Sequence, residues 1–414
     1  MIFTQISEAE FEAFQKHHPY RNFLNSAAAI RLKKRSNWEV EFVGVKEKDE
    51  LLCACFLSAI PIMKLYKYYY ASRGLLIDFR DRALLHFFIE NIVAYLKTKK
   101  ALYFHIDPFV FAQQRDINGD VVEGGFDNRD IVEILKEEQF IHQGYTIGNS
   151  SIFQCRWMFT LPLVGESEES ILANMHQQTR WSINKTLRDG IEVRELKEDE
   201  LSIFAEMMDV TSKRRSFNDR GIEYYRNFIE VYGKECKLLL AYLDVEKHLE
   251  KLQGELATTL EELTSVEEHL KENETSKKFI KRKKVLIEAV ELYHKKIADS
   301  LVLEKQHGKV IPMAGSMFVL QGDEVTYLHS GTFDEFKRFN APYALQWHMI
   351  CYAIKHGYGR YNFYGISGDF RKEAEDYGVY DFKKGFNGVV EELIGDFYLP
   401  INKKAFALYK KLKM

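Results

Sequence analysis

The chain has 414 residues, of which 46% are apolar and 14% aromatic, so it is long and apolar enough for two or three folded cores. A disordered chain is excluded. Its 58 Lys and Arg against 61 Asp and Glu give a formal net charge of −3. This near balance excludes a wholly basic nucleic-acid-binding protein, but it allows local basic patches.

No segment of the sequence is typical of export or of membrane insertion. The first residues lack the basic start and the long apolar stretch of a secretory signal. The longest apolar run, residues 51–63, is interrupted by Pro61 and is shorter than the roughly 20 residues that span a bilayer. The 5 cysteines are scattered and match no zinc motif. We therefore expect a cytoplasmic protein with buried thiols and with neither a metal nor another cofactor.

The first half of the chain predicts a mixed α/β unit. Residues 42–62 predict two strands joined by a polar turn, and YKYYYAS at 66–72 predicts a third strand. A helix over about 82–97 and a short strand, LYFHIDP at 102–108, complete the unit.

The second half predicts the same order of elements. After helices within 169–190 and 198–233, residues 311–331 predict strand, turn and strand. A helix over about 341–356 and the strand RYNFYGISG at 360–368 follow. Strand–strand–helix–strand therefore occurs twice, which indicates two copies of one supersecondary plan.

Residues 244–308 interrupt the second unit and predict a helical hairpin. Apolar residues spaced alternately by four and three form a heptad seam, and a second helical run follows ENETSKK at 272–278. The seam residues are Val245, Leu249, Leu252, Leu256, Thr259, Leu263, Val266 and Leu270. Each helix is about 45 Å long at 1.5 Å per residue. The faces of the hairpin also allow pairing with another copy, so a homodimer is possible.

Charges in the hairpin are segregated. Residues 244–274 hold ten acidic residues against three lysines, whereas 277–296 hold eight basic residues against two glutamates. Pairing between the two helices explains part of this pattern. The remaining excess lies at the tip, where a polyanion such as RNA would fit. The tip cations are Lys277, Lys278, Lys281, Arg282, Lys283 and Lys284.

Three further basic clusters lie near predicted element ends. They favour an anionic substrate such as a phosphate or diphosphate, although single cations at helix ends are usually solvated. The clusters are Arg31, Lys33, Lys34 and Arg35 before Trp38; Arg180, Lys185 and Arg188; and Lys213, Arg214, Arg215 and Arg220.

Two residues are candidates for catalysis. YDFKKGFNG at 380–388 reads as a strand that turns Lys383 or Lys384 into an aromatic interior, where a lysine would stabilise a developing oxyanion. The alternative is an edge strand protected by lysines. Asp107, at the end of the strand 102–108, is a candidate base or a simple turn residue.

Taken together, these motifs resemble the Fem family of peptidyltransferases over nearly the whole chain. The resemblance is carried by FLNS at 23–26 with Lys33 and Trp38, and by the order of the motifs around the inserted hairpin. The other motifs are YFHIDP at 103–108, RWSINKTLRDG at 180–190, TSKRRSF at 211–217, APYALQWHMI at 341–350, RYNFYGISG at 360–368 and FKKGFNG at 382–388.

The resemblance implies an α/β (α+β) fold of two GNAT-like acyltransferase subdomains with an inserted antiparallel coiled-coil hairpin. We expect the first subdomain over 1–148, the second over 149–243 plus 309–394, and the arm over 244–308. The tail, 395–414, is expected to pack on the first subdomain.

The implied activity is transfer of Ala, Ser or Gly from aminoacyl-tRNA to the stem-peptide amine of a peptidoglycan precursor. The precursor is lipid II or UDP-MurNAc-pentapeptide, and the reaction would take place at the inner face of the cell membrane with peripheral contact only. The alternatives are an acyl-CoA-dependent N-acyltransferase and a non-catalytic RNA-binding protein. A Gly-rich pyrophosphate loop, which the first alternative needs, is not evident in the sequence.

The resemblance also implies roles for individual residues. Lys383 and Asp107 fall on catalytic positions, and the tip cations of the hairpin fall on a tRNA-binding arm. The diphosphate of the acceptor is assigned to Lys33 together with Arg214 or Arg215. The remaining expected substrate contacts are Trp38, Tyr103, Tyr364 and Phe382.

Overall fold

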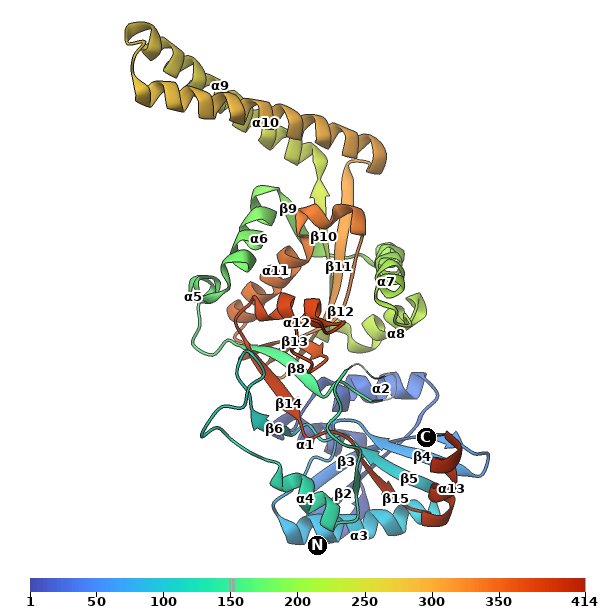
Figure 1. Ribbon diagram of the computed structural model, residues 1–414. Helices are drawn as coiled ribbons and strands as arrows, with labels where there is room; N and C mark the ends of the chain where they lie inside the picture. Colours follow the sequence, from blue (N-terminus) through green and yellow to red (C-terminus); the bar gives the residue numbers. More distant parts are fainter. Residues whose placement is uncertain (149, 151–152, 414) are drawn as a thin grey trace.

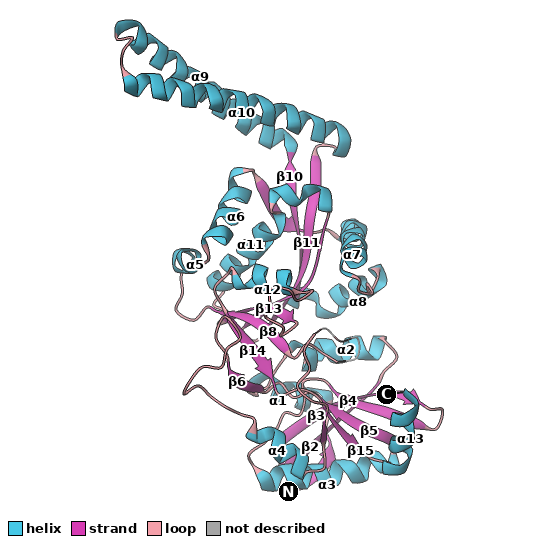
Figure 2. Cartoon of the chain, in the orientation of Figure 1, coloured by secondary structure: helices cyan, strands magenta, loops and turns pink. Residues whose placement is uncertain are grey.

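The computed structural model describes residues 1–148, 150 and 153–413, and it contains two β-sheets with a long helical arm (Figures 1 and 2). Helices pack around both sheets, and the arm projects from the second sheet (Figure 1). This architecture confirms the predicted α/β class with an inserted hairpin.

The first sheet has seven strands in the order β1-β2-β3-β4-β5-β15-β7. The strands are β1 Ile2–Gln5, β2 Glu39–Glu47, β3 Glu50–Ile62, β4 Tyr66–Ala71, β5 Ala101–Ile106, β15 Phe397–Pro400 and β7 Ile141–His142. The accompanying helices are α1 Glu8–His17, α2 Ala27–Arg35, α3 Arg82–Thr98, α4 Asp130–Glu137 and α13 Lys403–Lys413.

The second sheet has eight strands in the order β6-β14-β8-β13-β12-β11-β10-β9. The strands are β6 Phe111–Gln114, β14 Val389–Leu393, β8 Trp157–Pro162, β13 Arg360–Ile366, β12 Glu324–Thr332, β11 Val310–Gln321, β10 Cys236–Asp244 and β9 Ile191–Glu195. The helices are α5 Glu168–Asn174, α6 Gln177–Arg188, α7 Leu201–Arg215, α8 Ile222–Tyr232, α11 Ala341–Lys355 and α12 Tyr377–Lys384, with short 3-10 turns at Phe23–Asn25, Glu198–Glu200, Gly233–Glu235 and Asp334–Phe339.

The repeated plan predicted from the sequence is present in both sheets. Strands β2, β3 and β4 are antiparallel, α3 follows, and β5 returns parallel to β4. In the same way β10, β11 and β12 are antiparallel, α11 follows, and β13 returns parallel to β12. Each helix covers its sheet because a parallel return needs a crossover connection.

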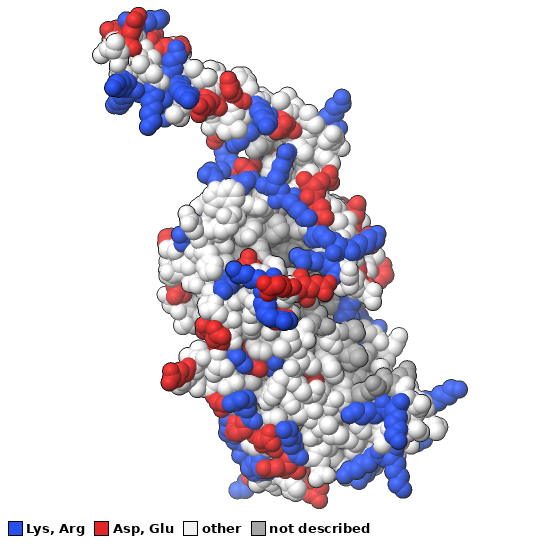
Figure 3. All heavy atoms as spheres, in the orientation of Figure 1, with Lys and Arg blue, Asp and Glu red and all other residues white. Residues whose placement is uncertain are grey.

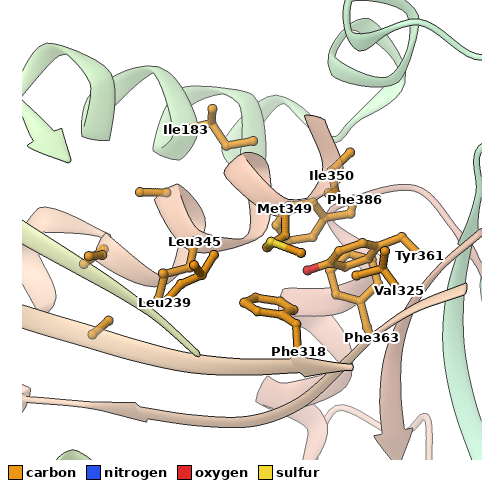
Figure 4. Packing of buried hydrophobic residues seen from close by; sticks show 14 of the residues in the cluster. Ile183, Leu239, Phe318, Val325, Leu345, Met349, Ile350, Tyr361, Phe363 and Phe386 are labelled. Atoms are coloured by element: carbon orange, nitrogen blue, oxygen red, sulfur yellow. The ribbon is translucent and has the colours of Figure 1, made fainter. Parts of the chain in front are cut away.

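The core of the second sheet fixes the position of α12. Side chains of α11, among them Leu345 and Met349, pack on strand residues such as Phe318 and Phe363 (Figure 4). Phe386, two residues after α12, is 1% exposed and belongs to the same core. Burial of this ring anchors the end of α12 beside β13.

The strand expected over 380–388 is wrong, because this segment begins as a helix. Residues Tyr377–Lys384 form α12, and the rings of Phe382 and Phe386 lie 5.5 Å apart. A spacing of four residues brings side chains together on one helix face, so the aromatic pattern that suggested strand alternation also fits a helix. Gly385 follows the helix where an added Cβ would lie 2.1 Å from Thr179 Oγ1.

The arm consists of α9, Val245–Glu272, and α10, Lys277–His307. It is inserted between β10 and β11 at Asp244 and Val310, which pair with each other, whereas the first sheet has only the turn of Lys48 and Asp49 at the equivalent place. Every predicted seam residue is buried or half-buried. No helix among the described residues is long and apolar enough to cross a membrane.

The arm should lose stability independently of the sheets when its seam is cut. Leu286 is 3% exposed in the seam, so Leu286→Ala should cost the arm about 2–4 kcal/mol by removing buried apolar contacts. Hydrogen exchange should accelerate in α9 and α10 while β10 and β11 remain protected. Leu292→Ala, at a position 52% exposed, is the control and should change little. Loss of protection spreading through both strands would contradict an independent arm.

Candidate functional site

A large cleft opens on the second sheet between α7, α11 and α12. Its volume is about 1080 Å³. The ends of β12 and β13 contribute to its wall, together with the 3-10 turn at Asp334–Phe339. Residues that supply charge to the cleft are Arg214, Arg215, Lys337, Asp369, Glu375, Asp376 and Lys383, and those that supply aromatic surface are Phe217, Tyr327, Phe333, Phe336, Tyr343 and Phe382.

Lys383 presents its amine at this cleft from a buried position. The side chain is 5% exposed, and Nζ donates to Gly365 O at 2.6 Å and to Tyr364 O at 3.4 Å. Burial lowers the pKa of the Lys383 ammonium to about 7, while Cys155 acts in the opposite direction. A lysine with this pKa is present in both charged and neutral forms near neutral pH, and either form is suited to proton or oxyanion chemistry.

The carbonyls that hold Lys383 are presented by a bulge in β13. Asn362 pairs with Thr160 of β8, but the next pair joins Gly365 to Met158, so β13 carries one extra residue. Tyr364 adopts a φ of +63°, and its amide donates to Asn362 Oδ1 at 2.7 Å. This strained geometry, supported by a buried asparagine, directs two successive carbonyl groups toward Lys383.

The expected phosphate-binding arginines, Arg214 and Arg215 at the end of α7, also line the cleft. Arg214 forms an ion pair with Asp334, and its Nη2 lies 3.3 Å from Thr332 Oγ1. Arg215 follows directly, is exposed and also lines the cleft. Both therefore line the same cleft as Lys383, whereas Lys33 is not among the residues that line it.

Asp107 does not line this cleft. It is 2% exposed at the end of β5, where Oδ1 accepts a hydrogen bond of 2.7 Å from the backbone amide of Arg73. Its Oδ2 lies 3.3 Å from Arg73 Nη1 but has no well-aligned hydrogen bond within the described residues. Burial raises the pKa of the Asp107 carboxyl to about 6, against the opposing effect of Arg73.

Arg73 connects the environments of the two catalytic candidates. Its side chain is 3% exposed, and Nη2 donates to Cys155 O at 2.8 Å, across from Asp107. Cys155 in turn lies within electrostatic range of Lys383. Arg73 has a φ of +50° and lies two residues after the end of β4. Nothing in the sequence around Ser72-Arg73-Gly74 indicated this role, because the partners of Arg73 come from distant parts of the chain.

A second group of candidates lies at the end of α2. Lys33 Nζ is 3.9 Å from the centre of the Trp38 ring and 5.4 Å from that of Tyr70. Burial lowers the pKa of Lys33 to about 8, with Asp107 opposing this shift and Arg220 adding to it. Lys33 is therefore close enough to Asp107 and Arg220 to sense both charges. Arg220, which lies 5.4 Å from the Tyr224 ring, is the arginine that the fold brings near Lys33.

The three aromatic candidates other than Trp38 have different surroundings. Phe382 lines the cleft and contacts the Tyr343 ring at 4.9 Å. Tyr364 is half-buried, with its ring 5.7 Å from Phe23. Tyr103 is 6% exposed and packs on Tyr398 and Phe406, so its side chain is a packing residue beneath α13.

A buried hydrogen-bond chain beside Asp107 was missed in the sequence. Tyr68 Oη lies 2.6 Å from His105 Nδ1, and His105 Nε2 lies 2.7 Å from Asp396 Oδ1. Asp396 raises the pKa of Asp107 through its charge. Only the alternation of polar and apolar residues in LYFHIDP hinted at an inward His105, and Asp396 is 291 residues further along.

Most of the other predicted cations are engaged in local structure. Lys34 pairs with Glu8 and Arg35 with Glu230, both at 2.6 Å. Arg180 Nη1 donates to Ala173 O, in the last turn of α5, at 2.7 Å, and Lys185 pairs with Asp189. These contacts favour the interpretation that the cations at 180–188 serve the local helix ends and do not bind an anionic substrate.

The tip of the arm retains unpaired cations. Arg282 makes a bidentate pair with Glu262, with both distances 2.7 Å, and Lys283 pairs with Glu267 at 2.9 Å. No carboxylate partner within the described chain contacts the other four tip lysines, which are Lys277, Lys278, Lys281 and Lys284. Figure 3 shows Lys and Arg side chains gathered at this end of the arm.

The described residues contain no cluster of His, Cys, Asp or Glu that would hold a metal ion.

Comparison with known proteins gives one family over almost the entire chain. The model of the FemAB family matches residues 6–414. Aminoacyltransferase FemA of Staphylococcus aureus strain MRSA252 is 34% identical over 414 residues, covering 100% of this chain and 98% of the relative. FemA of the bovine strain RF122 / ET3-1 matches to the same extent.

A solved structure supports the same relationship. The crystal structure of FemX superposes with a TM-score of 0.83 at 26% identity, covering 99% of both chains. The sheets, the arm and the buried site therefore occur in a chain that belongs to the FemAB family.

Proposed function

We propose that the protein is an aminoacyltransferase that adds an amino acid to the stem-peptide amine of a peptidoglycan precursor, using aminoacyl-tRNA as donor and lipid II as acceptor. The observation that carries this proposal is the buried Lys383 amine at the wall of a large cleft, in a chain similar over its length to FemA aminoacyltransferases. Ala, Ser and Gly are the candidate amino acids.

The reaction is aminolysis of an ester. The acceptor amine attacks the carbonyl carbon of the aminoacyl ester, and a tetrahedral intermediate with a negatively charged oxygen forms. The bond to the ribose oxygen then breaks, an amide remains, and the proton lost by the amine ends on the ribose hydroxyl. The charged form of Lys383 is suited to stabilising the oxyanion and the departing oxygen.

The acceptor is assigned to the space near Lys33, and the donor ester to the cleft. Lys33, stacked on Trp38, and Arg220 supply two positive charges for a diphosphate. Arg214 and Arg215 supply positive charge beside the donor ester. Asp107 has a pKa near 6, which suits a group that accepts the proton of the amine or holds the amine in position.

The direct test is to incubate the protein with labelled Ala-, Ser- or Gly-tRNA and lipid II and to measure labelled lipid. We expect transfer from at least one donor. No transfer from any of the three would overturn the proposed function.

Replacement of Lys383 should separate activity from stability. Lys383→Met should lower kcat by roughly 10²–10³, as expected when an oxyanion-stabilising group is lost, with donor binding retained. The folded pKa of about 7 lies below the ordinary 10.5, so the unfolded chain binds more protons between these pH values and wild-type stability rises across that window. Lys383→Met lacks this pH-dependent contribution to stability.

The free energy of unfolding of Lys383→Met, measured with urea, should therefore exceed that of the wild type most below pH 7. This difference should shrink toward pH 10. Lys384→Met is the matched control, because Lys384 Nζ does not line the cleft: it donates to Asn118 Oδ1 at 2.7 Å and lies 5.4 Å from the centre of the Tyr380 ring. Unchanged kcat in Lys383→Met would rule out the proposed role.

The acceptor assignment predicts a selective effect on one substrate. Lys33→Met and Arg220→Met should each raise the KM for lipid II about tenfold, since each removes a charged hydrogen-bond donor to phosphate, and should leave the KM for tRNA unchanged. Lys34→Met is the control, because Lys34 is paired with Glu8. A larger effect of Arg214→Met than of Arg220→Met on the lipid II KM would return the phosphate role to Arg214.

The four unpaired tip lysines predict a salt-dependent tRNA contact. Changing Lys277, Lys278, Lys281 and Lys284 together to Gln should raise the KM for tRNA about tenfold at low salt. It should also reduce the slope of log KM against log salt by about three, because fewer counterions are released. Four exposed lysines outside the arm, Lys16, Lys197, Lys234 and Lys355, changed to Gln, are the control. Equal effects of both sets would show that the arm makes no specific contact.

A further inference from the structure

The edge of the first sheet carries an exposed apolar and cationic surface. The turn between β3 and β4 exposes Leu65 by 73%, and α13 exposes Leu412 by 70% and Leu408 by 54%. Among the described large hydrophobic residues, only Val164 is more exposed than Leu65. Leucines exposed to this extent in one group indicate a surface that contacts another apolar phase.

The turn and the helix form one continuous surface. Asn402 Nδ2, just before α13, lies 3.2 Å from Tyr66 Oη, just after the turn. The inner side of α13 is buried through Phe406, which packs with Tyr103 in the same apolar cluster as Tyr66. Leu408 and Leu412 are one helical turn apart, so they share the outward side of α13.

Lysines surround the exposed leucines. The sequence of α13 up to Leu412 contains Lys403, Lys404, Lys410 and Lys411 and no acidic residue, and Lys64 lies in the turn. Figure 3 shows Lys and Arg side chains gathered over this lower edge of the molecule, where Figure 1 places α13 and the β3–β4 turn. Lysine is depleted in the centre of protein–protein interfaces, whereas leucine flanked by lysine is typical of helices that lie on anionic bilayers.

This surface is joined to the Lys33 site by a row of aromatic rings. The Trp38 ring lies 6.1 Å from Tyr68, Tyr68 lies 5.0 Å from Tyr103, and Tyr103 lies 5.1 Å from Phe406 of α13. Lys33 is stacked on Trp38 at the other end of this row. A molecule whose phosphates bind at Lys33 therefore lies close to the lysine-rich edge formed by α13 and the β3–β4 turn.

We propose that α13 and the β3–β4 turn form a membrane-docking surface, in which Leu65, Leu408 and Leu412 enter the headgroup region of an anionic bilayer and the surrounding lysines bind lipid phosphates. The surface holds the Lys33 site at the bilayer, so that an acceptor with a lipid anchor is reached without leaving the membrane. The inference that docking gives access to a lipid-anchored acceptor rests on the proposed function, whereas the docking itself does not.

Vesicle binding tests the docking. The full-length protein is sedimented with vesicles of phosphatidylcholine containing 30% phosphatidylglycerol, and with phosphatidylcholine vesicles alone. We expect binding to the anionic vesicles that weakens with salt. Leu65→Ser with Leu412→Ser should lower the partition coefficient about tenfold. The control pair, Val164→Ser with Leu187→Ser, removes equally exposed apolar side chains elsewhere and should bind as the wild type does.

The lysines are tested in the same assay. Lys404→Glu with Lys411→Glu should abolish the preference for phosphatidylglycerol, and Lys197→Glu with Lys355→Glu should not. Absence of vesicle binding by the wild type, equal loss in the control pairs, or a dimer in sedimentation velocity that the leucine variants disrupt, would each overturn the docking proposal.

The functional consequence has its own readout. The leucine variants should transfer more slowly to lipid II in vesicles but at the wild-type rate to a water-soluble UDP-linked acceptor. Equal rates of wild type and variants on vesicles would overturn the link between docking and acceptor access. Vesicle binding by a wild type that transfers to neither acceptor would reject the proposed function and leave the docking surface in place.

Discussion

The arrangement of the site depends on a buried guanidinium at the junction of the two sheets. Arg73 has 3% exposure, and a charge in such a place is tolerated only when its partners are fixed around it. One partner is the Asp107 carboxylate from the first sheet, and the other is the Cys155 carbonyl from the segment that leads into the second sheet. The same interaction therefore joins the two halves and fixes the position of the Asp107 carboxylate, which lies near Lys33, relative to the Lys383 amine in the cleft.

Lys383 is also a buried cation, but backbone carbonyl groups hold it where Arg73 has a carboxylate partner. A buried ammonium without a carboxylate partner lowers the stability of the folded chain. Within the described residues no carboxylate pairs with Lys383, and the bulge in β13 provides carbonyl dipoles that oppose this cost. The result is an amine that titrates near neutral pH, and the extra residue in β13 is the structural means of obtaining it.

The sequence allowed prediction of the elements whose periodicity was strong, and it failed where partners are distant. The arm, the repeated strands and the helices α3 and α11 follow from heptads, alternation and turn residues. Residues 380–388 were misread because aromatic side chains four apart satisfy a helix as well as a strand. Motifs singled out Lys383 and Asp107 as candidates, whereas no motif pointed to Arg73, His105 or Asp396, since their contacts join parts of the chain separated by up to 291 residues. The proximity of Arg220 to Lys33 likewise depends on how α2 lies against the second sheet.

The exchange of strands between the sheets has a consequence for synthesis. β6, from the N-terminal part of the chain, pairs with β14 in the second sheet, while β15, from the C-terminal end, is inserted between β5 and β7 of the first. The first sheet therefore stays incomplete on the ribosome until residue 400 has emerged, with an open edge at β5 and nearly the whole second sheet already made. Long-range pairings of this kind form late and slowly. The nascent chain must keep that edge from pairing with other chains until its own last strand arrives.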